Sequence, residues 1–177
     1  MFFGSGVRTV LGCYDMGKQM RGSLIALTAL TLWPVGSGVA AETAKSQETA
    51  AVMSVVNQFV DAFNKGDVKT AGTACAEQAS IIDEFAPHEW HGAGACLKWM
   101  NDYNADAKKR NITDGVVTLG KARHVEVDGD AAYVVVPTDY VYKMGGKPVK
   151  ETNSTLTVVL KKTASRWRIT AWAWSEN

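Results

Sequence analysis

The sequence predicts one α+β domain in which three helices precede and cover a mostly antiparallel sheet. In the first half of the domain, apolar residues recur at spacings of three and four, the period of a helix that buries one face. After Asn111 the period changes to two, which is typical of strands, and short turns separate these strands. Strands joined by short turns are antiparallel neighbours, and their apolar face needs the cover that helices supply.

Three segments are predicted to be helices. The first ends before Gly66 and has one apolar face, formed by Val52, Val55, Val56, Phe59, Val60 and Phe63. Asp67 is placed to cap a short second helix over residues 68–76. A third helix is predicted over residues 93–109, and the basic run Lys108-Lys109-Arg110 at its end suits the negative end of the helix dipole.

Five segments are predicted to be strands. A short strand covers residues 80–85 and ends before Pro87. Four longer strands follow, at residues 116–127, 131–144, 147–161 and 166–175. In the last strand, alternation puts Trp167 on the core face and Trp172 and Trp174 on the opposite face. Two tryptophans on that face indicate a pocket lining or a subunit interface.

Residues 1–41 are interpreted as a targeting segment outside the domain, which covers residues 42–177. From Met20, the predicted translation start, a basic residue leads into an apolar run of roughly a dozen residues and then a small-residue exit ending at Ala41, the pattern of a secretory signal peptide. The run falls short of the ~20 residues that span a bilayer. An uncleaved membrane anchor is the alternative, but export to the periplasm or the medium is the favoured prediction.

The charge of the chain excludes some partners. Removing the targeting segment takes away three basic residues and one acidic residue, so the net charge changes from +1 to −1. A nearly neutral domain has no field that concentrates polyanions. We therefore expect neither nucleic acid nor an anionic membrane surface as a partner.

The two cysteines of the domain, Cys75 and Cys96, are predicted to form a disulfide, because export places them in an oxidising compartment. Such a bond closes a loop of about 20 residues and contributes roughly 3 kcal/mol to stability. The alternative is that both are small buried apolar side chains. No Cys-x-x-Cys motif is present, so neither a zinc ribbon nor a redox enzyme is indicated.

Three short motifs occur in order along the domain. They are Val56-x-x-Phe59-x-x-Ala62-Phe63-x-x-Gly66-Asp67, Trp90-x-Gly92 and Trp167-Arg168-Ile169-x-x-Trp172. With them, residues 48–176 resemble the nuclear transport factor 2-like, or SnoaL-like, superfamily. The resemblance implies a cone-shaped α+β domain with three N-terminal helices packed on a curved, mostly antiparallel sheet. Residues 81–92 also resemble an exported bacterial branch of uncharacterised function.

The superfamily includes ketosteroid isomerases, polyketide cyclases, dehydratases, transport factors and binding proteins without catalysis, so the fold alone does not predict a function. Asp83 is the first candidate catalytic residue. If Ile81 and Phe85 face the core, strand alternation turns Asp83 inward as well. A carboxylate in an apolar cone has the raised pKa that a general base needs. Asp139 is the second candidate, although the isomerase pattern of one base and several donors is incomplete.

A metal site at His88 and His91 is a further alternative, but their spacing lacks the helical i, i+4 pairing and Pro87 disfavours a helix. We therefore predict no metal and no cofactor. The favoured function is an exported domain that binds a small apolar or aromatic molecule, with Asp83 as the polar anchor. The predicted lining is Trp90, Trp99, Tyr103, Tyr140, Tyr142 and Trp174. The alternatives are a proton-transfer isomerase, cyclase or dehydratase that uses Asp83 or Asp139, and a homodimer that associates through the sheet at Trp172 and Trp174.

Overall fold

The computed structural model describes residues 37–176 of the chain. The helices in this part are α1 (Ser37–Asn64), α2 (Val68–Ala74) and α3 (Ala95–Arg110). The strands are β1 (Cys75–Ile82), β2 (Glu89–Ala93), β3 (Ile112–Leu119), β4 (His124–Asp128), β5 (Ala131–Met144), β6 (Lys147–Thr163) and β7 (Arg166–Ser175). Most of the predicted targeting segment lies outside the described residues, and its last five residues form the start of α1.

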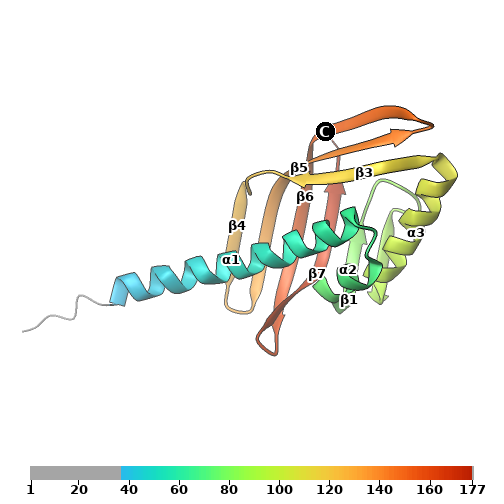
Figure 1. The fold of residues 1–177 in the computed structure, drawn as a ribbon. Coiled ribbons are helices and arrows are strands. Elements are labelled where there is room, and N and C mark those ends of the chain that lie inside the picture. Colours follow the sequence, from blue (N-terminus) through green and yellow to red (C-terminus); the bar gives the residue numbers. More distant parts are fainter. Residues whose placement is uncertain (1–36, 177) are drawn as a thin grey trace, which may run out of the picture. The chain divides into compact units, whose positions relative to one another are not determined.

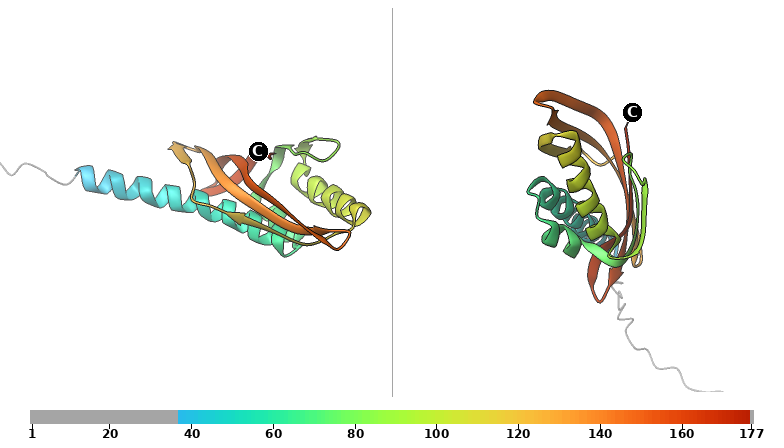
Figure 2. Two further views of the ribbon diagram at one scale, coloured as in Figure 1. Left: turned by 90° about the horizontal axis from the view of Figure 1, so that it is seen from above. Right: turned by 90° about the vertical axis from the view of Figure 1, so that its right-hand side faces the viewer.

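The strands form one curved sheet in the order β2-β1-β7-β6-β5-β3, and β4 also pairs with β5. All neighbouring strands are antiparallel except β1 and β7, which are parallel. The three helices lie against one face of the sheet (Figures 1 and 2). The predicted fold class, three helices packed on a curved and mostly antiparallel sheet, is therefore confirmed.

The predicted strands differ from the structure in three places. The strand predicted at residues 80–85 begins earlier, at Cys75, and ends at Ile82, so Asp83 lies just after it. The strand predicted at residues 116–127 is two strands, β3 and β4, which pair with different parts of the long strand β5. They separate at Gly120, where a Cβ atom would lie 3.2 Å from the carbonyl oxygen of Pro137. Strand β2 was not predicted, because it forms by pairing with β1 from a segment that has no apolar period of its own.

Strand β7 contains a bulge, and because of it the prediction for the face of Trp172 is wrong. Leu160 pairs with Ile169, whereas the preceding residue of β6 pairs with Ala171, so Thr170 is an extra residue in β7. The extra residue shifts the alternation, which brings Trp172 to the same face as Ile169. Trp172 is only 5% exposed within this single chain. The prediction that this ring lies on the face opposite the core is wrong.

The core lies between the sheet and the helices. Val52, Val56 and Phe59 of α1 are buried against the sheet, and burying each such side chain contributes about 1.5–3 kcal/mol. The predicted disulfide is present: it joins Cys75, the first residue of β1, to Cys96 in the first turn of α3, with their Cα atoms 6.5 Å apart. The bond ties α3 to the strand that leads to Asp83.

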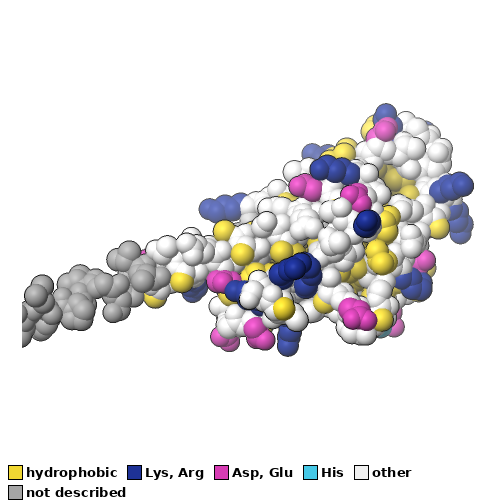
Figure 3. All heavy atoms as spheres, turned by 60° about the horizontal axis from the view of Figure 1, so that its bottom comes forward, with side chains coloured by type: hydrophobic (Ala, Val, Ile, Leu, Met, Phe, Trp, Pro, Cys, Tyr) yellow, Lys and Arg dark blue, Asp and Glu magenta, His cyan; other side chains and the backbone are white. Residues whose placement is uncertain are grey.

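Charged side chains of both signs are interspersed on the surface, and neither sign forms a wide patch on the face that Figure 3 shows. This distribution agrees with the near-neutral net charge. Within residues 37–176, no helix combines the length and the apolar character needed to cross a membrane.

Candidate functional site

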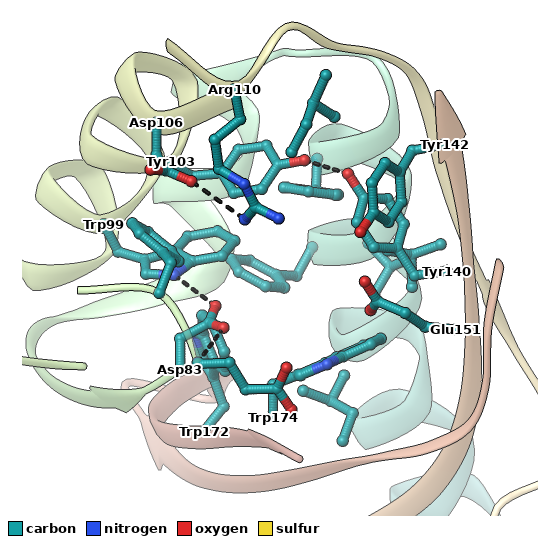
Figure 4. Close-up of a pocket in the computed structure, with 18 residues that line it drawn as sticks. Asp83, Trp99, Tyr103, Asp106, Arg110, Tyr140, Tyr142, Glu151, Trp172 and Trp174 are labelled. Atoms are coloured by element: carbon teal, nitrogen blue, oxygen red, sulfur yellow. Dashed lines mark hydrogen bonds and ion pairs between the residues drawn. The ribbon is translucent and has the colours of Figure 1, made fainter. Parts of the chain in front are cut away.

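A cavity of about 110 Å³ lies between the helices and the inner face of the sheet, and 18 residues line it (Figure 4). Half of them are aromatic: Phe59, Phe63, Phe85, Trp99, Tyr103, Tyr140, Tyr142, Trp172 and Trp174. A cavity of ~150 Å³ with an apolar lining holds one benzene molecule. The space in this structure therefore suits a ligand with a single ring or a short chain.

Asp83 provides a carboxylate in the wall of this cavity. It follows β1 directly, and because Ile81 is fully buried, alternation along the chain turns Asp83 to the same side. Its Oδ2 accepts a hydrogen bond of 2.8 Å from Trp99 Nε1, and its Oδ1 accepts one of 2.6 Å from the backbone N–H of Glu84. Figure 4 shows the carboxylate beside the indole of Trp99.

Burial raises the pKa of Asp83 from 3.8 to about 6, against the opposing effect of its two hydrogen bonds. The negative charges of Glu84 and Glu151 contribute to the same increase. Asp83 is thus ionised at neutral pH and is a stronger base than an ordinary aspartate. Both properties suit a general base.

Three tyrosines form the opposite part of the wall. The hydroxyls of Tyr103 and Tyr140 are hydrogen-bonded to each other, and the rings of Tyr140 and Tyr142 stack with their centroids 4.6 Å apart. Burial raises the pKa of Tyr103 and of Tyr140, and raises that of Tyr142 to about 12. All three hydroxyls therefore stay protonated at neutral pH and remain hydrogen-bond donors.

The structure places five of the six predicted lining residues in the cavity wall: Trp99, Tyr103, Tyr140, Tyr142 and Trp174. The sixth, Trp90, lies behind Phe85, with the ring centroids 5.0 Å apart, and its Nε1 donates to Asp102 Oδ2 at 2.8 Å. Trp90 thus packs behind the lining and joins β2 to α3.

The second predicted acid, Asp139, is not in the cavity wall. Its neighbour Tyr140 faces inward, so alternation turns Asp139 outward, where its Oδ1 accepts a hydrogen bond of 3.2 Å from the backbone N–H of Asn153. His91 pairs with the exposed Glu89 at 3.2 Å. Among the described residues, no group of three or more His, Cys, Asp or Glu side chains is arranged to hold a metal ion.

Several lining residues were not predicted, in particular Glu151 and Arg110, whereas Trp172 was predicted to lie either in a pocket lining or at a subunit interface. Only the face assigned to Trp172 was wrong, because simple alternation does not account for the bulge in β7. Arg110 belongs to the basic run at the end of α3, which the helix dipole already explains. Glu151 lies in a polar stretch of β6, where the sequence carries no signal that distinguishes it.

A substitution at Gly115 tests how tightly the Tyr140 side chain is packed in the cavity wall. A Cβ atom on Gly115 would lie 2.7 Å from the hydroxyl oxygen of Tyr140, so Gly115→Ala is expected to displace this ring and separate it from Tyr103. Overpacking of this kind costs about 1–3 kcal/mol, which urea denaturation would measure. In a Tyr140→Phe background the closest contact is gone, and the cost should be clearly smaller. An equal cost in both backgrounds would show that the Tyr140 hydroxyl is not what Gly115 accommodates.

The SnoaL-like domain family matches residues 52–175, and the chain belongs to this family. No curated protein matches the sequence. Many solved structures do. One is a hexachlorocyclohexane dehydrochlorinase, LinA-type3, from Novosphingobium barchaimii, with a TM-score of 0.66, 13% identity and coverage of 77% of this chain and 90% of that chain.

Two other solved structures are similar to this chain over most of its length. An NTF2-like protein with a cystatin-like fold from Novosphingobium aromaticivorans has a TM-score of 0.63, 16% identity and coverage of 78% and 87% of the two chains. A ketosteroid isomerase-like protein from Erwinia carotovora has a TM-score of 0.59, 15% identity and coverage of 73% and 95%. At these identities the likeness establishes the fold, and the function has to be argued from the site.

Proposed function

We propose that the domain binds a small, mainly apolar organic molecule in its aromatic cavity and that Asp83 transfers a proton on that molecule. The observation that carries this proposal is the Asp83 carboxylate, buried in the cavity wall with its pKa raised to about 6. Surface aspartates do not combine burial, a raised pKa and a position in a cavity wall.

The reaction begins when the Asp83 carboxylate removes a proton from a carbon atom next to a carbonyl group. The electrons of the broken C–H bond move into the carbonyl, and negative charge develops on its oxygen. The hydroxyl pair of Tyr103 and Tyr140 is one donor for this charge. The N–H of Trp172 is another, because it is buried and has no hydrogen-bond partner among the described residues. Asp83 then returns the proton to another carbon, so the reaction is an isomerisation without a cofactor.

The similar structures support this class of reaction. Two of them are described as a ketosteroid isomerase-like protein and a dehydrochlorinase. Loss of hydrogen chloride, like isomerisation of a ketone, needs a group that accepts a proton from carbon. The cavity of about 110 Å³ favours a ligand smaller than a steroid.

Binding without a reaction is the second candidate function. In its favour, both oxygens of Asp83 already accept hydrogen bonds, and the hydroxyls of Tyr103 and Tyr140 are bonded to each other. In this arrangement the polar groups would orient the ligand, and the raised pKa of Asp83 would be a consequence of burial alone.

The test uses 3-cyclohexen-1-one, a single-ring ketone whose isomerisation to the conjugated 2-cyclohexen-1-one is followed by ultraviolet absorbance. We expect turnover by the wild type, with kcat/KM rising as the pH passes through about 6 and Asp83 ionises. Asp83→Asn should lower kcat/KM by about 10²–10⁴-fold, as expected for the loss of a general base. Asp139→Asn is the matched control and should keep the wild-type rate.

Turnover that survives Asp83→Asn would contradict the assignment of the base. Quenching of tryptophan fluorescence by the ketone, without turnover, would establish the second candidate. Both results are interpretable because Trp99, Trp172 and Trp174 line the cavity and report binding directly.

We also propose that the domain is exported. The disulfide between Cys75 and Cys96 supports this location, because such bonds persist in oxidising compartments. Mass spectrometry of the protein recovered outside the cytoplasm should find Glu42 as its first residue. An intact terminus at Met1 would contradict cleavage after Ala41.

A further inference from the structure

The aromatic cavity contains more negative than positive groups. Asp83, Glu84, Asp106 and Glu151 all belong to its lining, and Arg110 is the one cationic side chain among the lining residues. Arg110 Nη1 is paired with Asp106 Oδ2 at 3.4 Å, and its other terminal nitrogen lies 3.7 Å from the sulfur of Met144. Arg110 is thus already engaged.

The other three carboxylates have no cationic partner. No Lys, Arg or His of residues 37–176 forms an ion pair with Asp83, Glu84 or Glu151. Their negative charges act on one another. Burial raises the pKa of Glu151, and the negative charges of Glu176 and Glu84 also raise it, whereas a hydrogen bond from Tyr142 and the more distant positive charge of Arg110 act in the opposite direction. Figure 4 shows Glu151 and Asp83 facing the same open space from opposite sides.

Apart from the charged groups and four aliphatic side chains, the wall consists of aromatic rings. Tyr140 and Tyr142 stack on one side, and Trp174 lies edge-on to Tyr140 with ring centroids 6.5 Å apart. Aromatic faces attract organic cations through the ring quadrupole, and this attraction grows when the cation is removed from water. An anion in the same space would meet three carboxylates that form no ion pair among the described residues.

We infer that the ligand of this cavity is a small organic cation, an amine or a quaternary ammonium compound, whose positive nitrogen lies near Glu151 within the ring wall. The inference rests on the proposed function only in taking the cavity as the ligand site. If Asp83 also acts as a base, the substrates are small amino ketones, in which the ammonium group faces Glu151 and the carbonyl faces the hydroxyl pair of Tyr103 and Tyr140. Carboxylates and phosphate esters are excluded.

Three probes of almost equal shape test this inference. They are choline, its neutral analogue 3,3-dimethylbutan-1-ol, and the anion 3,3-dimethylbutanoate, each titrated into the wild-type protein while tryptophan fluorescence is recorded. We expect choline to bind at least about tenfold more tightly than the alcohol and the anion to show no binding. The difference between choline and the alcohol should shrink as salt is added.

Two variants test whether the preference for choline arises from the cavity. Glu151→Gln should weaken choline binding several-fold and leave binding of the alcohol unchanged. Glu77→Gln removes the same charge from an exposed position on β1 and should change neither. If Glu151→Gln proves less stable in urea, Glu84→Gln at the exposed rim replaces it as the test variant.

Equal affinities for choline and the alcohol, preferred binding of the anion, or no binding of any probe would each overturn the inference. These outcomes are separate from the test of proton transfer. The probes do not react, so a failure of the ketone assay leaves the charge preference standing. Conversely, turnover of the neutral ketone with no preference for choline would retain the proposed function and remove the cationic ligand.

Discussion

Replacing both Cys75 and Cys96 with serine is expected to lower the free energy of unfolding by about 3 kcal/mol. The disulfide closes a loop with a sequence separation of 21 residues, and its removal gives the unfolded chain more conformations. The bond also ties the first turn of α3 to the start of β1. Trp99 follows Cys96 by less than one turn, so the hydrogen bond from Trp99 to Asp83 should weaken as well.

Urea denaturation at neutral pH measures this loss, with and without a reducing agent. Reduction should lower the midpoint of the wild type and leave the midpoint of the double serine variant unchanged. An unchanged midpoint on reduction of the wild type would contradict a stabilising disulfide. A change in the double variant would show that the reducing agent acts elsewhere.

Replacing Asp83 with asparagine is expected to stabilise the protein above neutral pH. Because burial raises the pKa of Asp83 from 3.8 to about 6, the folded protein binds a proton more tightly than the unfolded chain between these two values. The free energy of unfolding therefore falls as the pH rises through this window, by roughly 3 kcal/mol in total. Asparagine carries no charge, so the variant does not lose this free energy as the pH rises.

The substitution also removes one of the two hydrogen bonds that Asp83 accepts, a loss of about 1 kcal/mol. We therefore expect Asp83→Asn to be roughly 2 kcal/mol more stable than the wild type at pH 8 and about equally stable at pH 4. Urea midpoints measured across this range test the sign. A wild type more stable than the variant at pH 8 would contradict the raised pKa, and Asp139→Asn serves as the control on the outer face.

Local patterns were sufficient to predict most of the fold. The helical period of α1, the cap at Asp67 and the turn at Gly145-Gly146 are all found in the structure. The errors arise where distant segments meet. Strand β2 exists because it pairs with β1, and the inward position of Trp172 depends on a bulge that β7 forms against β6. Neither feature leaves a periodic signal in its own segment.

In the candidate site, too, residues with a local sequence pattern were predicted and residues placed by distant contacts were not. Asp83 and Trp99 were predicted because each follows the period of its own element, and the structure joins them by a hydrogen bond. Glu151 and Arg110 have no such local signal. Their importance comes from where β6 and the end of α3 lie in space, so a single sequence does not reveal it.

Two parts of the cavity wall differ in the bonds that fix their position, because only one of them is attached to the disulfide. Asp83 and Trp99 belong to segments joined by a covalent bond, whereas Tyr142 and Glu151 lie on the β5–β6 hairpin, which backbone hydrogen bonds hold in place. The base Asp83 and its partner Trp99 therefore lie on a different part of the molecule from Glu151, the group that we assign to ligand choice, although the donor Tyr140 belongs to the same hairpin as Glu151. Such a separation favours evolvability: substitutions in the hairpin can redirect the pocket to new ligands while the base and its partner stay unchanged.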